Sequence, residues 1–574
     1  MLAILLTVLC LFPSFPSINA ASQPARPLSS SVAPPNLPPS THYPPQRILS
    51  PTFPRLHVLY VVAVATWTHI AAPIEYLLEL QRRGHRVTWQ QPRELVSRFF
   101  ASEEERLSLP FNFSLVELNY SSVDEAVQLM TERPWMEVLD QLARLSYESV
   151  YPTAHRAMMA AVEQDRPDIV LCDSVADHCV DITAQLKLPA VIAHCTTLMD
   201  QYQPMPHFDL PSSATPYSHR WHEQPLWHRL YNTFGVLPQL AWSGIATALR
   251  AAEMKRALGA PISDTGIASF RGREVLYDSS WAWEWPLYWP PYLHMVGPIP
   301  KTWRKRHSRQ IDPHQQRWLD DSVAAGVPVV YVAMGSIAKL TDEWLRKFAT
   351  AFSSCPALPV GVSAPNQTTP FRVLWATRRT PSWLTDLLPP SVRVEQWVNQ
   401  PAVLEHPAVH LFLSHGGMSS SQEAIAVGLP ILALPLFVDQ PPLAARLQDR
   451  GVAEVLDKMT FTADEMCAAM RRLVFDPQVR VSADMLQRLY HKSDSGGVQR
   501  AVDVIERAAV STDHLIPYRE RQEVSWVVRY NVDVYAIGLA VLVAVLVAMC
   551  VVAWLVLRSV LRLMEGRRTK SKLA

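Results

Sequence analysis

The chain has 574 residues, enough for several domains and too many for one small module. Its 53 Lys and Arg against 52 Asp and Glu leave a net charge of +1, which disfavours a nucleic acid as partner. Hydrophobic residues make up 49% and charged residues 18%. This composition excludes disorder throughout and fits a globular protein with membrane-directed segments.

The N-terminal 54 residues are predicted to lie outside the folded body. The apolar run 2–12 is too short to span a bilayer, and Ala20 offers a small residue at a cleavage site. We therefore expect residues 1–20 to be a secretory signal peptide, with a signal anchor as the alternative. Residues 21–54 hold ten prolines and many serines, so they are predicted to form a disordered tether.

Two series of apolar, β-branched runs alternate with helical patterns in the body of the chain. Buried parallel strands have this continuous apolar character. In the first series, strands are predicted at 56–65, 86–89, 168–172 and 190–193, with a helix at 72–83. In the second, they are predicted at 327–334, 372–375, 409–414, 430–434 and 452–456.

This alternation predicts an α/β fold of two Rossmann-like, doubly wound domains. We place the first at 55–300 and the second at 301–515, with the seam in the Pro- and Trp-rich stretch 286–309. Ligands of such domains bind at the carboxyl ends of the strands. Because no G-x-G-x-x-G follows the first strand, a nicotinamide or flavin enzyme is disfavoured.

A membrane span is predicted near the C-terminus. Residues 534–557 are 24 consecutive uncharged residues, about 36 Å as a helix, against roughly 30 Å of hydrocarbon. A buried soluble helix is the alternative. The basic tail 558–574 is expected in the cytosol, which leaves the body lumenal. The last residues, KSKLA, resemble a dilysine retrieval signal, so we expect a single-pass type I protein of the endoplasmic reticulum membrane.

Cysteine usage indicates neither a disulfide framework nor a metal site. Cys10 leaves with the signal and Cys550 lies in the span, so an odd and scattered five of the seven cysteines remain. Metal-ligand spacing is lacking as well. Three N-x-S/T sequons, at Asn112, Asn119 and Asn366, fit a lumenal body.

The most informative motif is a strand followed by His415-Gly416-Gly417 and a helix that carries Glu423. Two glycines let backbone amides approach a ligand, and the serines Ser419, Ser420 and Ser421 are expected to cap the helix. The exposed N–H groups and the positive end of the helix dipole favour an anion. The motif therefore predicts a phosphate site, although ordinary turn chemistry would give the same pattern.

The 44-residue segment 397–440 closely resembles the donor-binding signature of the UDP-glycosyltransferases, the inverting GT-B superfamily that includes the animal UDP-glucuronosyltransferases. The stretch YVAMGS at 331–336 and the segment 278–300, which ends in Met295-Val296-Gly297, resemble further parts of that family. With the signal peptide, the span and the tail, the resemblance covers nearly the whole chain from residue 55.

The resemblance implies a UDP-sugar as donor and assigns residues to it. Trp397 stacks on uracil with Gln400 at its edge, and Glu423 holds the ribose. The pyrophosphate meets four residues: Ser336, His415, Gly417 and Ser420. Asp439 and Gln440 hydrogen-bond the sugar. Ser419 stands where the family usually has Asn, which puts sugar positioning in doubt, and Leu443 replaces a common Asn and is expected to pack.

Catalysis needs a base to take the proton of the acceptor hydroxyl, and a histidine suits this role. The resemblance points to His69, just after the first strand, as the general base. Asp173 follows the strand DIVLC and is expected to orient that histidine. Asp177 and His178 lie near enough in sequence to compete with Asp173. Neither a metal nor a cofactor is implied, and no D-x-D motif follows a strand.

The acceptor is expected to be lipophilic, but the sequence does not name it. Residues 199–242 are rich in Trp, Tyr, Phe and Pro, and they are predicted either to form the acceptor pocket or to pack as a lid. The alternative function is a non-catalytic UDP-sugar-binding partner protein. The sequence leaves three questions open: whether the protein forms a homo-oligomer, which sugar is donated, and whether its role is biosynthetic or detoxifying.

Overall fold

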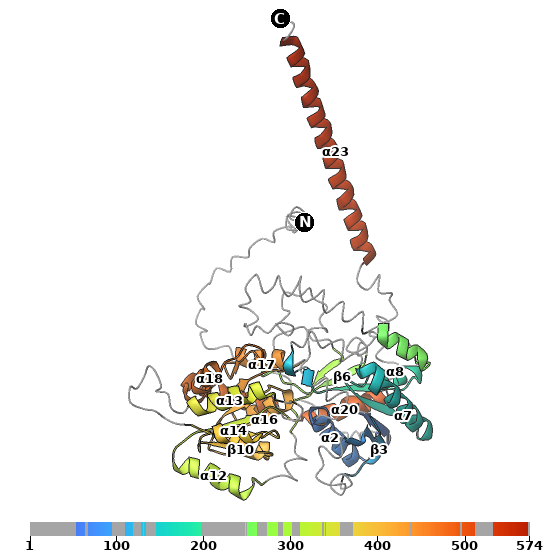
Figure 1. Ribbon diagram of the computed structural model, residues 1–574. Helices are drawn as coiled ribbons and strands as arrows, with labels where there is room; N and C mark the ends of the chain where they lie inside the picture. Colours follow the sequence, from blue (N-terminus) through green and yellow to red (C-terminus); the bar gives the residue numbers. More distant parts are fainter. Residues whose placement is uncertain are drawn as a thin grey trace, which may run out of the picture. The chain divides into compact units, whose positions relative to one another are not determined.

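The computed structural model describes most of the body of the chain and one long C-terminal helix (Figure 1). The described residues are 53–63, 67–94, 109–118, 128–129, 131–133, 145–196, 247, 249–260, 273–284, 291–300, 310–335, 338, 340–355, 371–436, 439–493, 496–510 and 532–571. The predicted signal peptide, nearly all of the predicted tether and the predicted acceptor segment 199–242 lie outside them.

The N-terminal domain is built on a parallel sheet of seven strands in the order β3-β2-β1-β4-β5-β6-β7. The strands are β1 His57–Val61, β2 Arg86–Pro92, β3 Asn112–Val116, β4 Ile169–Asp173, β5 Ala190–His194, β6 Glu274–Tyr277 and β7 Leu293–Met295. Every residue of β1, β4 and β6 is buried. Such strands are covered on both faces, which explains the apolar residues at their centres.

Helices cover both faces of this sheet. Helix α2 (Trp67–Arg82) packs on the face that carries Tyr60 and Leu171. Helices α7 (Tyr151–Gln164) and α8 (Asp177–Gln185) pack on the face that carries Leu59 and Val170. A short π-helical turn, η1 (Leu145–Val150), leads into α7. The alternating strand residues thus enter two separate cores.

The C-terminal domain has a parallel sheet of six strands in the order β10-β9-β8-β11-β12-β13. Its strands are β8 Val329–Ala333, β9 Arg372–Ala376, β10 Val392–Glu395, β11 Val409–Ser414, β12 Ile431–Ala433 and β13 Ala453–Val455. Its helices are α12 Pro313–Ala324, α13 Asp342–Ser354, α14 Ser382–Leu387, α15 Gln400–Leu404, α16 Met418–Ala426, α17 Gln440–Asp449, α18 Ala463–Phe475 and α19 Pro477–Ser493. The predicted α/β fold with two doubly wound domains is confirmed.

The last helix of the body, α20 (Gly497–Val510), returns to the N-terminal domain. It lies against α2 and strands β4, β5 and β6 (Figure 1). Its Val502 and Ile505 enter the same core as Tyr60. Arg83 at the end of α2 pairs with Asp503 and Glu506. The predicted C-terminal domain, 301–515, therefore includes a helix that packs against the sheet of the N-terminal domain.

Four strands were not predicted from the sequence: β3, β6, β7 and β10. Strand β7 lies inside the predicted seam 286–309 and adds an edge to the N-terminal sheet by pairing with β6. The connection between the domains thus begins after β7. Buried polar contacts made by Asp278 hold this region: its Oδ1 accepts from Ile299 N at 3.0 Å.

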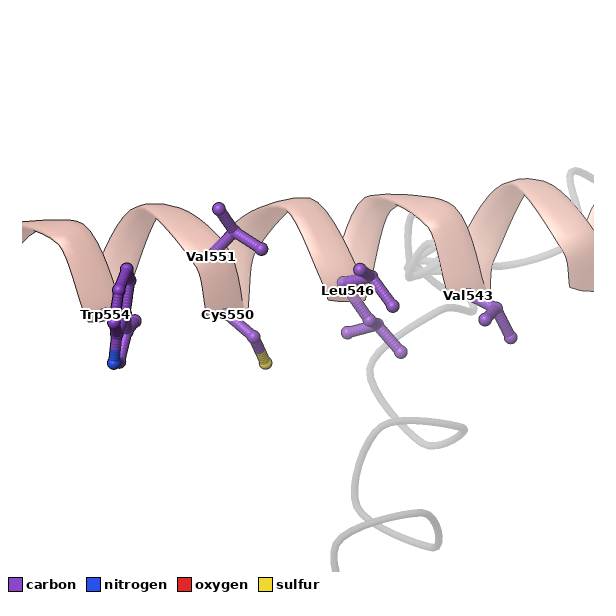
Figure 2. Close-up of a pocket in the computed structure, with 6 residues that line it drawn as sticks. Val543, Leu546, Cys550, Val551 and Trp554 are labelled. Atoms are coloured by element: carbon purple, nitrogen blue, oxygen red, sulfur yellow. The ribbon is translucent and has the colours of Figure 1, made fainter.

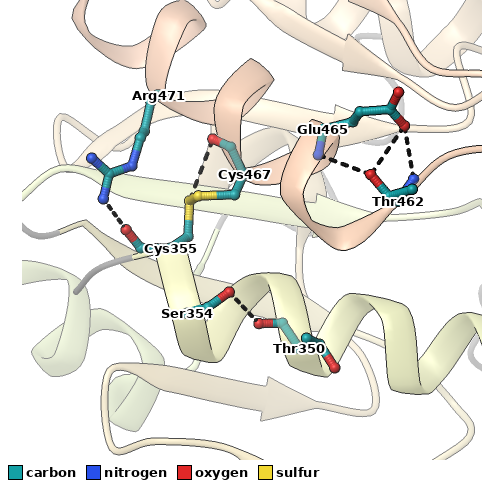
Figure 3. Close-up of a disulfide and its surroundings, with 7 residues drawn as sticks. All are labelled: Thr350, Ser354, Cys355, Thr462, Glu465, Cys467 and Arg471. Carbon is teal, nitrogen blue, oxygen red and sulfur yellow. Dashed lines mark hydrogen bonds between the residues drawn. A yellow bond between two sulfur atoms is a disulfide. The ribbon is translucent and has the colours of Figure 1, made fainter. Parts of the chain in front are cut away.

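The described residues include two disulfides, so the prediction that the cysteines form no framework was wrong. Cys172 pairs with Cys179, and Cys355 pairs with Cys467, 112 residues away. The second bond joins the end of α13 to α18, beside the contact of Arg471 with the Cys355 carbonyl (Figure 3). Scattered positions in the sequence meet because α13 and α18 pack on the same face of the sheet.

The C-terminal helix α23 (Val532–Ser571) is the one helix in the described part of the chain that is long and apolar enough to cross a membrane, over Ala536–Ser559. Its side chains at these positions are largely exposed. One face carries a shallow apolar hollow (Figure 2) lined by Val543, Leu546, Val547, Cys550, Val551 and Trp554. Apolar side chains on all sides are what a lipid-facing helix requires.

Candidate active site

His69 and Asp173 meet at the carboxyl edge of the N-terminal sheet. Asp173 is the last residue of β4, and His69 lies in the first turn of α2 rather than in the loop before it. The His69 Nδ1–H donates to Asp173 Oδ1 at 2.7 Å. The Tyr60 hydroxyl donates to the His69 carbonyl at 2.6 Å and anchors the start of the helix. Because β1 pairs with β4, their ends bring these two residues together.

Burial and the charges around His69 act in opposite directions. Desolvation of the buried ring lowers the pKa of His69, but the Asp173 carboxylate, with a further contribution from Cys195, outweighs it and holds that pKa well above 6.5. Asp173 itself is fully buried. A protonated imidazole is therefore stabilised at this position, and Asp173 fixes the tautomer in which Nε2 is free to accept a proton.

The two competitors of Asp173 take other partners. Asp177 accepts a hydrogen bond from the Tyr147 hydroxyl. His178 packs edge-on against the Tyr151 ring, and burial lowers its pKa to about 3. The Cys172–Cys179 disulfide closes the turn that carries all three candidates. Of these candidates, only Asp173 is placed to orient His69.

Sequence reasoning missed Cys195 as a neighbour of this pair. It directly follows β5, whose Ala193 lies in register with Asp173 on β4. Its thiol is free and buried, and burial raises the pKa of that thiol. The predicted strand end at 193 carried the signal: residues after neighbouring parallel strands gather at one edge of a sheet.

The helix that follows the HGG motif has a bare N-terminus. The N-cap of α16 is Gly417, which has no side chain to cap the helix. The expectation that the serines cap it was wrong, since Ser419, Ser420 and Ser421 lie within the first turns of α16. The first backbone N–H groups of a helix capped in this way are left for a ligand, and the dipole favours a negative charge there.

The His415 ring lies against two glycines, Gly335 after β8 and Gly417 in its own loop. A Cβ on Gly335 would lie 2.7 Å from its Cε1, and a Cβ on Gly417 would lie 2.5 Å from its Nε2. Gly335 also has φ +79°, which other residues rarely adopt. Burial lowers the pKa of His415 to about 4. The ring is therefore neutral at pH 7, and one of its nitrogens can donate a hydrogen bond while the other accepts.

A polar network joins three of the predicted donor residues. The Gln400 amide donates to Glu423 Oε2 at 2.8 Å and to Ser420 Oγ at 3.2 Å. Trp397, three residues before Gln400 in the sequence, has 60% of its surface exposed. An exposed indole suits stacking on a flat heterocycle, and a carboxylate beside a hydroxyl suits a sugar hydroxyl.

The remaining predicted residues lie around the start of α17. Asp439 is its N-cap, and Gln440, its first residue, accepts from Leu436 N at 2.8 Å. A Cβ on Gly416 would lie 3.9 Å from the Gln440 carbonyl, so this helix begins beside the HGG motif. Ser419 is buried, and Leu443 packs in the core as expected. Ser336 lies outside the described residues.

Direct contacts connect the two domains near these residues. The Gln422 amide of α16 donates to the Asp278 carbonyl, just after β6, at 2.9 Å. Arg446 of α17 pairs with Glu284 at 2.8 Å, and both side chains are fully buried. Helices α2 and α16 are also in contact. The elements that carry His69 and the HGG motif are thus neighbours.

Two parallel α/β domains in this arrangement define the fold of the GT-B glycosyltransferases. The glycosyltransferase of kitacinnamycin matches with a TM-score of 0.55 and 21% identity, over 79% of this chain and 99% of that one. LpCGTa, solved in complex with UDP, matches with a TM-score of 0.52 and 19% identity, over 80% of this chain and all of that one. At these identities the likeness establishes the fold alone.

Residues 57–567 match the family described as UDP-glucoronosyl and UDP-glucosyl transferase, and the chain belongs to this family. A UDP-glycosyltransferase of Talaromyces amestolkiae is 26% identical over 69% of this chain and 78% of its own length. UDP-glycosyltransferase stmC of Aspergillus ustus is 25% identical over 85% of this chain and 95% of its own length.

Several mammalian relatives are matched over a smaller share. Human UDP-glucuronosyltransferase 2B7 is 25% identical over 62% of this chain, and the match spans 63% of that protein. Mouse UDP-glucuronosyltransferase 2A1 is 27% identical over 44% of this chain, and the match spans 43% of it. The chain thus spans less than two thirds of these relatives.

Proposed function

We propose that this protein transfers a hexosyl or glucuronosyl group from a UDP-sugar to a hydroxyl of a lipophilic acceptor, with inversion at the anomeric carbon. The observation that carries the proposal is the 2.7 Å hydrogen bond from His69 Nδ1 to Asp173 Oδ1. It leaves Nε2 as the basic nitrogen, on a helix that contacts the helix with the bare N-terminus. Family membership supplies the class of donor.

The reaction is a single in-line displacement. His69 Nε2 takes the proton of the acceptor hydroxyl while its oxygen forms a bond to the anomeric carbon. The bond from that carbon to the UDP oxygen breaks on the opposite face, and UDP leaves with the electron pair. Asp173 stabilises the imidazolium that results, as the third member of a catalytic triad does.

The donor is held by the C-terminal domain. Trp397 stacks on the uracil with Gln400 at its edge, and Glu423 accepts from the ribose. The backbone N–H groups at the start of α16 and the neutral His415 donate to the pyrophosphate with Ser336, Gly417 and Ser420, and they stabilise the charge that develops on UDP. Asp439, Gln440 and Ser419 contact the sugar. The reaction as proposed uses neither a metal nor a cofactor.

We propose the endoplasmic reticulum membrane as the location, with a type I orientation and the body in the lumen. Three features support this location: the candidate span on α23, the basic residues after it and two disulfides, which persist in oxidising compartments. A body held beside a bilayer would meet lipophilic alcohols, phenols or sterols at high local concentration. This is the basis for the proposed acceptor class.

The test is transfer by microsomes that contain the full chain, with a panel of labelled UDP-sugars and lipophilic acceptors. We expect one UDP-sugar to give a product whose anomeric configuration, read by NMR, is opposite to that of the donor. Trp397→Ala should raise KM for the donor, while Trp554→Ala, an exposed tryptophan of α23, should leave it unchanged. UDP binding without transfer across the panel would instead favour the non-catalytic binding protein.

A further inference from the structure

Three potential metal ligands of different chemistry surround one point at the edge of the N-terminal sheet. His69, Asp173 and Cys195 each offer a ligand atom, and these atoms all lie within 4.8 Å of one another. All three residues are buried. They come from three elements, because His69 lies on α2, Asp173 ends β4 and Cys195 follows β5.

Part of this cluster is not used by the proposed reaction. Asp173 Oδ1 accepts the hydrogen bond from His69, while the buried Oδ2 of Asp173 has no hydrogen-bond partner among the described residues. The thiol of Cys195 is free and is not a participant in sugar transfer. A carboxylate oxygen is costly to bury without a partner. A cation would satisfy it, and the Cys195 thiol lies close enough to bind the same cation.

We propose that His69, Asp173 and Cys195 form a binding site for Zn²⁺, and that Zn²⁺ bound there blocks sugar transfer. Imidazole nitrogen, carboxylate oxygen and thiolate sulfur are the three ligand types that Zn²⁺ accepts. Mg²⁺ and Ca²⁺ prefer oxygen ligands, so they do not compete for this set. Three protein ligands leave a fourth position for water, as in other sites with an open coordination position.

The geometry needs only local adjustment. Zinc–ligand bonds of about 2.0–2.3 Å in a tetrahedron separate the ligand atoms by roughly 3.3–3.8 Å, so the widest pair in the cluster closes by about 1 Å. On binding, the Cys195 thiol and the His69 imidazolium each release a proton to solvent while sulfur–zinc and nitrogen–zinc bonds form, with no change of oxidation state. Burial raises the pKa of this thiol, so the metal must displace a proton that the apoprotein retains.

Zinc binding does not depend on the proposed function, but its inhibitory effect does. A zinc ion coordinated by a nitrogen of His69 prevents the ring from acting as a base. The ion also occupies the space of the acceptor hydroxyl. Zn²⁺ should therefore inhibit without competing with the UDP-sugar. EDTA should restore the rate, because the bound cation is no part of the reaction.

The experiment uses the purified full-length protein and Zn²⁺, with Mg²⁺ as the control cation. Metal content after gel filtration and the half-inhibitory concentration are measured for the parent, Cys195→Ala and Cys550→Ser. Cys550 is the other free cysteine in the described part of the chain and lies on α23, so it is a matched control. Thermal unfolding and far-UV circular dichroism establish that Cys195→Ala is folded, and inhibition is expressed relative to each variant's own rate without zinc.

We expect about one Zn²⁺ per chain in the parent and in Cys550→Ser, and binding weakened at least about tenfold in Cys195→Ala. Equal zinc content and equal inhibition in the parent and Cys195→Ala would overturn the proposal, because binding would then belong to other residues. Cys195-dependent zinc binding in a protein that transfers no sugar would uphold the site and refute the proposed function. Transfer that Zn²⁺ leaves untouched would refute the inhibitory role alone.

Discussion

Arg446 and Glu284 form a fully buried ion pair, 2.8 Å from Nε to Oε2, between α17 and the segment that follows β6. The other carboxylate oxygen of Glu284 accepts from Tyr277 and Ser279 at 2.5 and 2.6 Å. Arg450 also donates to the Glu284 carbonyl at 2.9 Å. This pair ties the helix that begins with the predicted sugar-binding residues to the edge of the N-terminal sheet.

Removing one partner of this pair should destabilise the protein strongly. Arg446→Met leaves the Glu284 carboxylate buried without a counter-charge, which costs about 3–5 kcal/mol in comparable cases. Arg472→Met is the control, since Arg472 and its partner Glu454 are partly exposed and such pairs contribute about 0–1 kcal/mol. Urea unfolding monitored by fluorescence measures both, and equal losses would contradict the role assigned to the buried pair.

The two disulfides should differ in what they contribute to stability. Constraint of the unfolded chain grows with loop length, so loss of Cys355–Cys467 should cost roughly 4–5 kcal/mol and loss of Cys172–Cys179 roughly 2–3 kcal/mol. Urea unfolding of Cys467→Ser and of Cys179→Ser gives the comparison. Alkylation of the intact body that labels Cys355 or Cys172 would show that these bonds do not form.

Gly335 should be needed for the position of His415, beyond its backbone conformation. Gly335→Ala places a methyl group against the His415 ring, whereas Gly326→Ala meets nothing within 4 Å. Both glycines have positive φ, +79° and +63°, so both variants should lose about 1–2 kcal/mol of stability. Only Gly335→Ala should also weaken UDP binding in calorimetry. An equal loss of UDP affinity in Gly326→Ala would show that the contact with His415 is not the cause of the loss.

Asp173 should set the pH dependence of transfer. The base works only when His69 is neutral, and the pKa of His69 is raised well above 6.5, chiefly by Asp173 against the opposing effect of burial. The value of kcat/KM should therefore rise with pH through a point above 6.5. Asp173→Asn removes the charge that raises the pKa, so this limb should move to lower pH while the rate falls about 10²–10⁴-fold.

The control for that profile is Asp177→Asn, because Asp177 contacts Tyr147 and not His69. Its acidic limb should coincide with that of the parent. A limb that moves in Asp177→Asn and stays fixed in Asp173→Asn would assign the orienting role to the wrong carboxylate.

Strands with a continuous apolar run could be predicted from the sequence. The run VHLFLS predicted β11 with the correct bounds at both ends, because burial on both sides selects a continuous apolar sequence. Strand β3 escaped prediction because it lies at the edge of the sheet with Asn112 exposed and a mixed pattern. Strand β7 has only three residues in a Pro-rich stretch, and so gives no periodic signal.

Contacts between distant segments could not be predicted from the sequence. The amphipathic pattern of α20 says that one face is buried, but it does not say on which sheet. Disulfide pairing depends on distances between Cα atoms, which scattered positions do not reveal. Cys195 has no motif around it, and its position just after a predicted strand is the one signal the sequence offered. For His69 and Asp173, the family resemblance together with their placement after strands predicted that they meet, since parallel strands end at one edge.

The rate of transfer by His69→Ala shows whether His69 removes the proton of the acceptor hydroxyl. We expect kcat to fall about 10²–10⁴-fold while the dissociation constant for UDP, measured by calorimetry, stays that of the parent. His410→Ala, which changes an exposed histidine of β11, should retain the parental rate. Transfer by His69→Ala at the full parental rate would show that His69 is not the base.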